Sequence, residues 1–226
     1  IETSCLKQVN DEFTAQAFIT TDLDDNQITA FHPGAMSHSH LNKVSDAGEL
    51  ALGIIAPDGR DGMMQHAEQF AAAGIPFVFD PGQGLPMFGK PELDRFLELA
   101  TYAAVNDYEA KMLCDRTGMT LEQIAEKLEA LVVTRGAEGS WVFTGGQRHD
   151  IPCVKAEQIA DPTGCGDAYR GGLLYGLTEG LGIVNAAKLA SLMGSLKIAV
   201  KGPQTYQHSR EEIASRFEAA FGQKPW

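Results

Sequence analysis

Short apolar runs alternate with helical stretches along most of the chain, and this alternation predicts the fold class. Apolar runs typical of buried strands lie at 50–56, 76–80, 101–105 and 130–134. Helical periodicity occupies 62–73, 91–99, 107–116, 121–128, 166–180, 184–199 and 209–221. Strands separated by helices in this way imply βαβ units and a largely parallel sheet, so the pattern predicts an α/β fold.

Two parts of the chain depart from this alternation and predict antiparallel hairpins. Residues 15–21 and 27–32 are β-prone and flank a cluster of turn-forming residues at 22–26. Later in the chain, 140–144 and 148–154 are joined across a Gly-Gly pair. This second pattern suggests a hairpin at one edge of the sheet.

The length of 226 residues suits one substantial core with a small appendage. No internal repeat and no low-complexity linker interrupts the chain. We therefore expect a mainly β hairpin and its connection at 1–48, followed by an α/β core at 49–226. Apolar residues make up 44% of the chain and charged residues 21%, which is the balance of an ordinary globular protein.

Charge and cysteine usage narrow the expected partners and location. The net charge of −12 argues against a nucleic-acid partner, because proteins that bind phosphate backbones concentrate Lys and Arg. No window approaches the roughly 18 apolar residues of a membrane span, and the first residues lack both a secretory signal and an initiator Met. The four cysteines are scattered without a CxxC pair. Reduced thiols, a cytoplasmic location and no membrane partner are therefore expected.

Residues 161–172 read DPTGCGDAYRGG and carry the strongest chemical signal in the sequence. Gly164 and Gly166 allow a tight turn whose backbone N–H groups form an anion-binding nest, and the helix that starts here adds its positive end. Asp167 lies in the same place, where it suits a base beside a transferring phosphoryl group better than a phosphate ligand. A plain helix start with Asp167 as its capping carboxylate is the alternative.

Other chemical interpretations of this segment fit less well. Gly164 and Gly166 are not followed by a third glycine three positions later, and they lie late in the chain, unlike a Rossmann motif. No GxxxxGK[ST] sequence is present, which excludes a P-loop. The Cys165 thiol sits at a helix N-terminus, but no histidine lies nearby in sequence to activate it as a nucleophile.

The run DPTGCGDAYRGGLLYG resembles the C-terminal signature of the ribokinase-like (PfkB) kinase family, D-T-x-G-A-G-D-x-F-x-x-G. The matching residues are Asp161, Gly164, Gly166, Asp167 and one of Gly171 and Gly172, whereas Pro162, Cys165 and Tyr169 replace the usual Thr, Ala and Phe. The resemblance implies a ribokinase-like fold, a mostly parallel sheet flanked by helices with a small β lid. It also implies that Asp167 is the general base, with the backbone N–H groups at Gly164, Cys165 and Gly166 stabilising the phosphoryl group.

A second motif, Asn106-Asp107-Tyr108-Glu109, matches the N-x-x-E sequence of the same family. It lies where a predicted strand gives way to a helix, so that Asn106 and Glu109 share one helical face. The resemblance implies that this pair organises Mg²⁺ and its waters near the ATP phosphates. Glu109 as an ordinary solvated helix residue is the alternative.

A third motif, TRGAEG at 134–139, resembles the family turn T-x-G-x-x-G. The resemblance implies that Thr134, Arg135, Gly136 and Gly139 contact ATP, and that Asn106 contacts it too. An arginine at this turn would neutralise developing charge. A simple strand–turn–strand is the alternative. Asp161 and Thr163 match positions that in many relatives help bind a monovalent cation, so K⁺ is a candidate beside ATP and Mg²⁺.

The resemblance implies transfer of the ATP γ-phosphoryl group to a hydroxyl of a small molecule. The segment is poor in Lys and Arg, which favours an uncharged sugar or purine nucleoside such as ribose, fructose or adenosine. The string FHPGA at 31–35 is similar to bacterial adenosine kinase-like proteins. A non-catalytic relative that binds nucleotide or sugar as a sensor or partner subunit is the alternative. The lid strands also make a homodimer a candidate assembly.

Three further features are weaker. Family members open with a strand and a G-G-x-x-x-N region that grips the acceptor, and neither is found here, so we expect part of the substrate pocket to lie outside this chain. SHSH at 37–40 lacks a third metal ligand and is interpreted as a solvated loop. DPGQG at 80–84 follows a predicted strand and either supports the pocket or only forms a turn.

Overall fold

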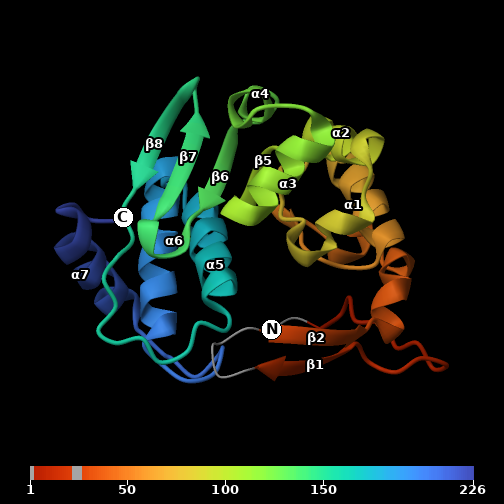
Figure 1. Cartoon of the computed structure of the whole chain (residues 1–226), viewed down its shortest axis with the longest axis horizontal. Coiled ribbons are helices and arrows are strands. Elements are labelled where there is room, and N and C mark those ends of the chain that lie inside the picture. The colour runs from red at the N-terminus through yellow and green to blue at the C-terminus, as the bar shows by residue number, and fades with distance from the viewer. Residues whose placement is uncertain (1–2, 22–26) are drawn as a thin grey trace. The chain divides into compact units, whose positions relative to one another are not determined.

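The computed structural model describes residues 3–21 and 27–226. The chain folds into two compact units, residues 1–100 and 101–226, whose elements are labelled in Figure 1. The expected boundary after residue 48 falls inside the first unit, and the division into lid and core stays a prediction. Among the described residues, no helix is both long and apolar enough to cross a membrane.

The first unit begins with the predicted hairpin. Strands β1 (Gln16–Thr21) and β2 (Gln27–His32) pair antiparallel, with Ala17 opposite Phe31. The turn predicted at 22–26 lies outside the described residues. Apolar side chains on both strands are exposed, among them Phe18 and Phe31.

A parallel βαβ arrangement follows in the same unit. Strand β3 (Gly53–Ile55) pairs with β4 (Phe77–Phe79), and helix α1 (Arg60–Ala72) connects them, followed by α2 (Lys90–Leu99). All three residues of β4 are buried, as expected for a strand covered on both faces. The rings of Phe79 and Phe96 stack with centroids 4.4 Å apart, which fixes α2 against β4.

Short 3₁₀ helices in the first unit were not predicted. The SHSH segment lies in one of them, Gly34–Leu41, and the Oγ of Ser39 and Nδ1 of His40 are buried, so the solvated-loop prediction was wrong. This segment packs on α1 because Gly62 has no side chain; a Cβ there would lie 2.0 Å from Ser39 Oγ. The DPGQG segment leads into another 3₁₀ helix, Gly82–Met87.

The second unit carries the remaining strands. Strands β5 (Tyr102–Asn106) and β6 (Ala130–Thr134) pair parallel, joined by α3 (Asp107–Thr117) and α4 (Leu121–Ala125). Strands β7 (Ser140–Thr144) and β8 (Gln147–Ile151) add antiparallel to β6 and form the predicted second hairpin. The predicted strands and helices of this unit are confirmed, with shifts of a few residues at their ends.

Three helices complete the second unit: α5 (Cys165–Thr178), α6 (Gly182–Ile198) and α7 (Arg210–Phe221). Figure 1 shows α5 and α6 side by side behind the strands β6 to β8. Their close approach depends on glycine, because a Cβ on Gly172 would lie 2.8 Å from Ala190 Cα and one on Gly176 would lie 2.7 Å from Ala186 Cα. Of the two motif glycines, Gly172 therefore serves helix packing.

Candidate active site

The start of helix α5 brings together the residues of the DPTGCGD motif. Gly164 precedes the helix with φ of 82°, and a Cβ there would lie 2.9 Å from Pro203 Cβ, so only glycine fits. No side chain caps the helix. The Cys165 N–H donates to Pro162 O at 3.1 Å, whereas the N–H groups of Gly166 and Asp167 have no intrahelical partner. The positive end of the helix is thus left without a side-chain acceptor.

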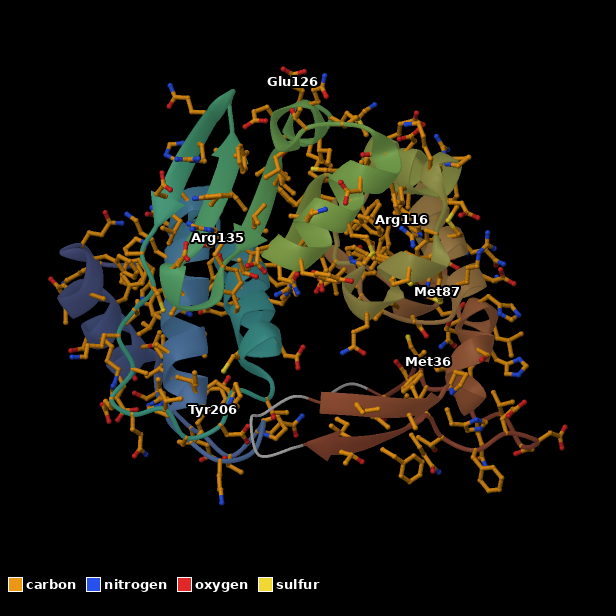
Figure 2. All side chains as sticks on the ribbon, in the orientation of Figure 1. Met36, Met87, Arg116, Glu126, Arg135 and Tyr206 are labelled. Atoms are coloured by element: carbon orange, nitrogen blue, oxygen red, sulfur yellow. The ribbon has the colours of Figure 1, made fainter. Side chains whose placement is uncertain are left out.

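The Asp167 side chain is exposed in the first turn of α5 and lines an open pocket of about 240 Å³. Other walls of this pocket come from Met193 on α6 and from Pro203 and Tyr206 in the loop after it; Figure 2 labels Tyr206. A neighbouring pocket of about 430 Å³ shares these three residues. A carboxylate, an uncapped helix start and open space therefore coincide.

Asp161 joins the loop before α5 to the end of α6. Its carboxylate accepts N–H bonds from Thr163 and Gly202, both at 2.9 Å. The Gly202 and Thr163 N–H groups, in that order, are the main reason that the pKa of Asp161 is lowered to about 2. Nζ of Lys197 donates to the backbone oxygen of Asp161 at 2.6 Å and lies 3.8 Å from its carboxylate.

The side chain of Cys165 points into the same loop. Its Sγ lies 3.9 Å from Asp161 O, and burial raises the pKa of the thiol. A thiol with a raised pKa is protonated at neutral pH, which agrees with the expectation that this side chain is not a nucleophile. The backbone N–H of Cys165, assigned from the sequence to the phosphoryl group, donates within the turn to Pro162 O.

Asn106 and Glu109 form a reciprocal capping box at the start of α3. Asn106 Oδ1 accepts from the Glu109 N–H at 2.8 Å, and Glu109 Oε2 accepts from the Asn106 N–H at 2.8 Å. Glu109 is half-buried, unlike a plain solvated helix residue. The sequence analysis did not predict this capping box, although an N-cap residue followed by Glu three positions later is its known signature.

The TRGAEG turn closes on itself at the end of β6. The Arg135 N–H donates to Gly139 O at 2.8 Å, and Gly139 has φ of 86° with its Cα so close to Ile151 O that no Cβ would fit. The Arg135 guanidinium pairs with Glu138 and lies 4.1 Å from the ring centre of Trp141. Arg135, labelled in Figure 2, is thus held by its own hairpin.

A chain of contacts brings these motifs into one region of the second unit. Asn106 ends β5 opposite Thr134, which ends β6, and Thr134 in turn lies opposite Ser140. The Ser140 Oγ and the Tyr169 hydroxyl on α5 are 2.8 Å apart, and burial raises the pKa of Tyr169 to about 12. The carboxyl ends of β5 and β6 and the first turns of α5 are therefore linked through Ser140 and Tyr169.

Among the described residues, no group of three His, Cys, Asp or Glu side chains is placed to hold a metal ion. The oxygen atoms of Asn106 and Glu109 are the ligand type that Mg²⁺ takes. A carboxylate oxygen accepts more than one hydrogen bond, so the capping box and a magnesium-bound water are compatible. These residues fit Mg²⁺ through its waters.

Comparisons with known proteins agree with the motif-based resemblance. The family model described as "pfkB family carbohydrate kinase" matches residues 1–210. A nucleoside kinase of Methanocaldococcus jannaschii is 32% identical over 220 residues, covering 96% of this chain and 72% of that protein.

Solved structures add the fold. Burkholderia thailandensis nucleoside kinase in complex with inosine shares 57% identity and superposes with a TM-score of 0.91, over 95% of this chain and 72% of that one. The same kinase in complex with ADP-inosine gives a TM-score of 0.90 over 95% of this chain and 67% of that one. A ribokinase of Thermotoga maritima, at 21% identity, shares the fold with a TM-score of 0.71 over 92% of this chain and 70% of that one.

Proposed function

The chain belongs to the pfkB family of carbohydrate kinases, and we propose that it phosphorylates a nucleoside at a site built around Asp167. It is an ATP-dependent sugar or nucleoside kinase with a ribokinase-like α/β fold. The finer proposal concerns the acceptor and the residues that act on it. The observation that carries it is the Asp167 carboxylate in an open pocket at an uncapped helix start.

Asp167 is proposed as the base that accepts the proton of the acceptor hydroxyl. As that proton leaves, the hydroxyl oxygen forms a bond to the γ-phosphorus of ATP, and the bond from the γ-phosphorus to the β–γ bridging oxygen breaks to release ADP. A carboxylate next to phosphate oxygens would repel them, which supports a role for Asp167 on the acceptor side. Its exposure keeps it within reach of a ligand.

The positive end of α5 is proposed to stabilise the charge on the transferring phosphoryl group. The N–H groups of Gly166 and Asp167 have no intrahelical partner, so they can donate to phosphate oxygens without breaking a helical bond. The backbone at Gly164 supports this by turning the chain with a positive φ. The Cys165 N–H contributes less to phosphoryl binding, because it already donates to Pro162 O.

The ends of β5 and β6 are proposed to hold the ATP side of the site. Mg²⁺, when bound, would neutralise negative charge on the ATP phosphates. Asn106 and Glu109 would hold it through its waters while keeping their capping bonds. Thr134, Gly136 and Gly139 would present backbone and hydroxyl groups to ATP. Arg135 would have to leave Glu138 or Trp141 to reach a phosphate, so its contribution depends on a side-chain rearrangement.

A nucleoside is favoured over a simple sugar as the acceptor. The two relatives at 57% and 32% identity that cover at least 95% of this chain are both nucleoside kinases, and one is described in complex with inosine. The local composition, poor in Lys and Arg around the motif, supports an uncharged acceptor. We therefore place inosine, adenosine and guanosine ahead of ribose and fructose as candidate acceptors.

ADP release from Mg-ATP tests the acceptor. The protein expressed from the complete open reading frame would be assayed with inosine, adenosine, guanosine, ribose, fructose, fructose 6-phosphate and no acceptor. We expect release that depends on a nucleoside and exceeds the ribose rate at least about tenfold in kcat/KM. Faster release with ribose or fructose would assign a sugar instead. Measurable ATP binding without release on any acceptor would favour the non-catalytic sensor or partner subunit.

The exposed hairpin supports a homodimer as a secondary proposal. Phe18 and Ile28 lie on one face of the β1–β2 pair, Ile19 and Phe31 on the other, and all four are more than half exposed. Two apolar faces exceed what one small ligand would cover. Light scattering after size-exclusion chromatography is expected to give a dimer mass, and a monomer at high concentration would contradict it. A cytoplasmic location is likewise proposed, supported by four free cysteines.

A further inference from the structure

Lys197, in the last turn of α6, is a lysine without any solvent-exposed surface. Lysine is almost never buried in this way unless its ammonium group is paired, because an isolated buried charge is very unfavourable. Its neighbours in sequence, Leu196 and Ile198, are apolar. The side chain must therefore have a specific electrostatic partner, and the partner lies next to the candidate active site.

That partner is Asp161. Nζ of Lys197 donates to the backbone oxygen of Asp161 at 2.6 Å and lies 3.8 Å from its carboxylate. The N–H groups of Ala160 and Asp161 donate back to Ile198 O, at 2.8 and 3.2 Å. The ammonium group is thus the positive centre of a joint between the loop that precedes α5 and the end of α6.

This joint fixes the position of the α5 start. Asp161 lies three residues before Gly164, and its carboxylate also accepts N–H bonds from Thr163 and Gly202. Gly202 is followed by Pro203, which lines the same pocket as Gly164 and Asp167 and leaves no room for a Cβ at Gly164. Loss of the ammonium group is therefore expected to shift the loop through Asp161 and the pocket wall through Gly202.

The residues present do not fit a monovalent cation. A cation such as K⁺ is held by carbonyl and carboxylate oxygens, and the sequence resemblance assigned that role to Asp161 and Thr163. Here the Asp161 backbone oxygen already accepts from an ammonium group, and the carboxylate lies within 4 Å of it. A second positive charge in the same place would be repelled by the first.

We infer that the Lys197 ammonium group takes the place of a monovalent cation and positions the start of α5, so that the kinase does not need K⁺. Lys197 is a positioning residue, acting through Asp161 on the loop that carries Gly164. The effect on turnover rests on the proposed function, whereas the effect on stability does not.

The thermal stability of the wild-type protein gives a first test that needs no activity and no variant. The melting temperature would be measured in chloride salts of K⁺, Na⁺ and tetramethylammonium at equal ionic strength. We expect the three values to agree within about 1 °C, because no site is left for K⁺ to stabilise. A rise of several degrees that is specific to K⁺, or activation by K⁺ of more than about fivefold, would overturn the inference.

The Lys197→Met variant gives the second test. Methionine keeps most of the length and the apolar stem but removes the charge, which leaves the Asp161 oxygens facing a space of about ammonium size. We expect a lower melting temperature, kcat at least about tenfold lower with a smaller change in KM, and partial recovery of both by K⁺ or NH₄⁺ but not by tetramethylammonium. Unchanged stability and turnover, or losses that no cation reverses, would contradict a cation-like role.

Lys201→Met is the matched control, because Lys201 follows four residues later and is exposed. It is expected to leave the melting temperature and turnover unchanged in every salt. If the Lys197→Met protein does not fold, the melting temperatures of the wild-type protein in the three salts decide the question. Absence of kinase activity on every acceptor, with the expected melting behaviour, would overturn the proposed function and leave the role of Lys197 standing.

Discussion

Two helix starts in the second unit, those of α3 and α5, use similar residues in opposite ways. At α3, Asn106 and Glu109 each accept the other's backbone N–H, so the first turn is closed by its own side chains. At α5 no side chain caps the helix, although Asp167 occupies the same third helical position as Glu109. The difference shows which carboxylate is committed to the fold and which is available to a ligand.

The physical cause of the difference is the residue before each helix. Asn106 has an extended backbone that lets its side chain turn back onto the helix, whereas Gly164 has a left-handed conformation and no side chain to offer. The start of α5 therefore lacks a side-chain capping bond, which would contribute about 1 kcal/mol to the free energy of unfolding. Keeping an uncapped helix end beside an open pocket is what an anion-binding site requires.

Asp167→Asn is expected to have the largest effect of any single substitution. It removes the base but little structure, so kcat should fall by about 10²–10⁴ while the affinity for ATP changes little. Turnover kinetics and isothermal titration with ATP would measure the two separately. Glu211→Gln is the control, because it removes an exposed first-turn carboxylate from α7. Equal turnover by Asp167→Asn and wild type would rule out the base assignment.

Gly164→Ala should follow in size. Alanine would occupy a left-handed conformation and approach Pro203, so we expect a loss of about 1–3 kcal/mol in the free energy of unfolding together with weaker ATP binding. Urea unfolding and ATP titration check both. Gly145→Ala, with φ of 57° and no atom within 4 Å of the added Cβ, should lose stability only through backbone strain and keep ATP affinity. Equal behaviour of the two variants would contradict a special role for Gly164.

Asn106→Ala should cost about 1 kcal/mol in the free energy of unfolding, because the α3 cap is lost. If Asn106 also orients magnesium waters, the Mg²⁺ concentration needed for half-maximal activity should rise severalfold. Thr120→Ala, which removes the N-cap of α4, is the control that loses stability without this change in Mg²⁺ dependence. A Mg²⁺ dependence identical to that of wild type would confine Asn106 to capping.

The smallest effect concerns pH. The pKa of Asp161 is lowered to about 2, chiefly by the Gly202 and Thr163 N–H groups. A lowered pKa in the folded state means that the carboxylate stabilises the protein above its unfolded pKa of about 3.9, and this contribution is lost as the pH falls towards 2. Asp161→Asn should therefore be less stable than wild type at pH 6, with a gap that narrows between about pH 4 and pH 2. Urea unfolding across this range would show a constant gap if the assignment is wrong.

The regular elements were predictable because their signals are local. The strand at Ala130–Thr134 is an unbroken apolar run between a helix and a glycine turn, and its bounds match the prediction. The 3₁₀ helix Gly34–Leu41 was not predictable, because it has little hydrophobic periodicity and forms through packing on α1. The strand predicted at 50–56 shortened to Gly53–Ile55, because β4, its partner in the first unit, pairs with only three of its residues.

The candidate site was predictable only where one motif holds it. Gly164 and Asp167 lie within four residues of each other, so their shared location follows from the sequence. The pairing of Asp161 with Lys197 does not follow from the sequence, because the two residues are 36 positions apart. In the sequence, Lys197 is only a single charged residue in a mainly apolar helix. The contact between Arg135 and the Trp141 ring was also not predicted. An arginine that binds phosphate and an arginine that stacks on an aromatic ring look the same in a sequence.

A crystal structure of the protein with inosine and a non-hydrolysable ATP analogue would test the central proposal most directly. We predict that an acceptor hydroxyl lies about 2.6–3.2 Å from an Asp167 carboxylate oxygen, with the γ-phosphate at the N–H groups of Gly166 and Asp167. A nucleoside whose hydroxyls all lie beyond direct or single-water reach of Asp167, with the phosphates at the capped start of α3, would contradict it.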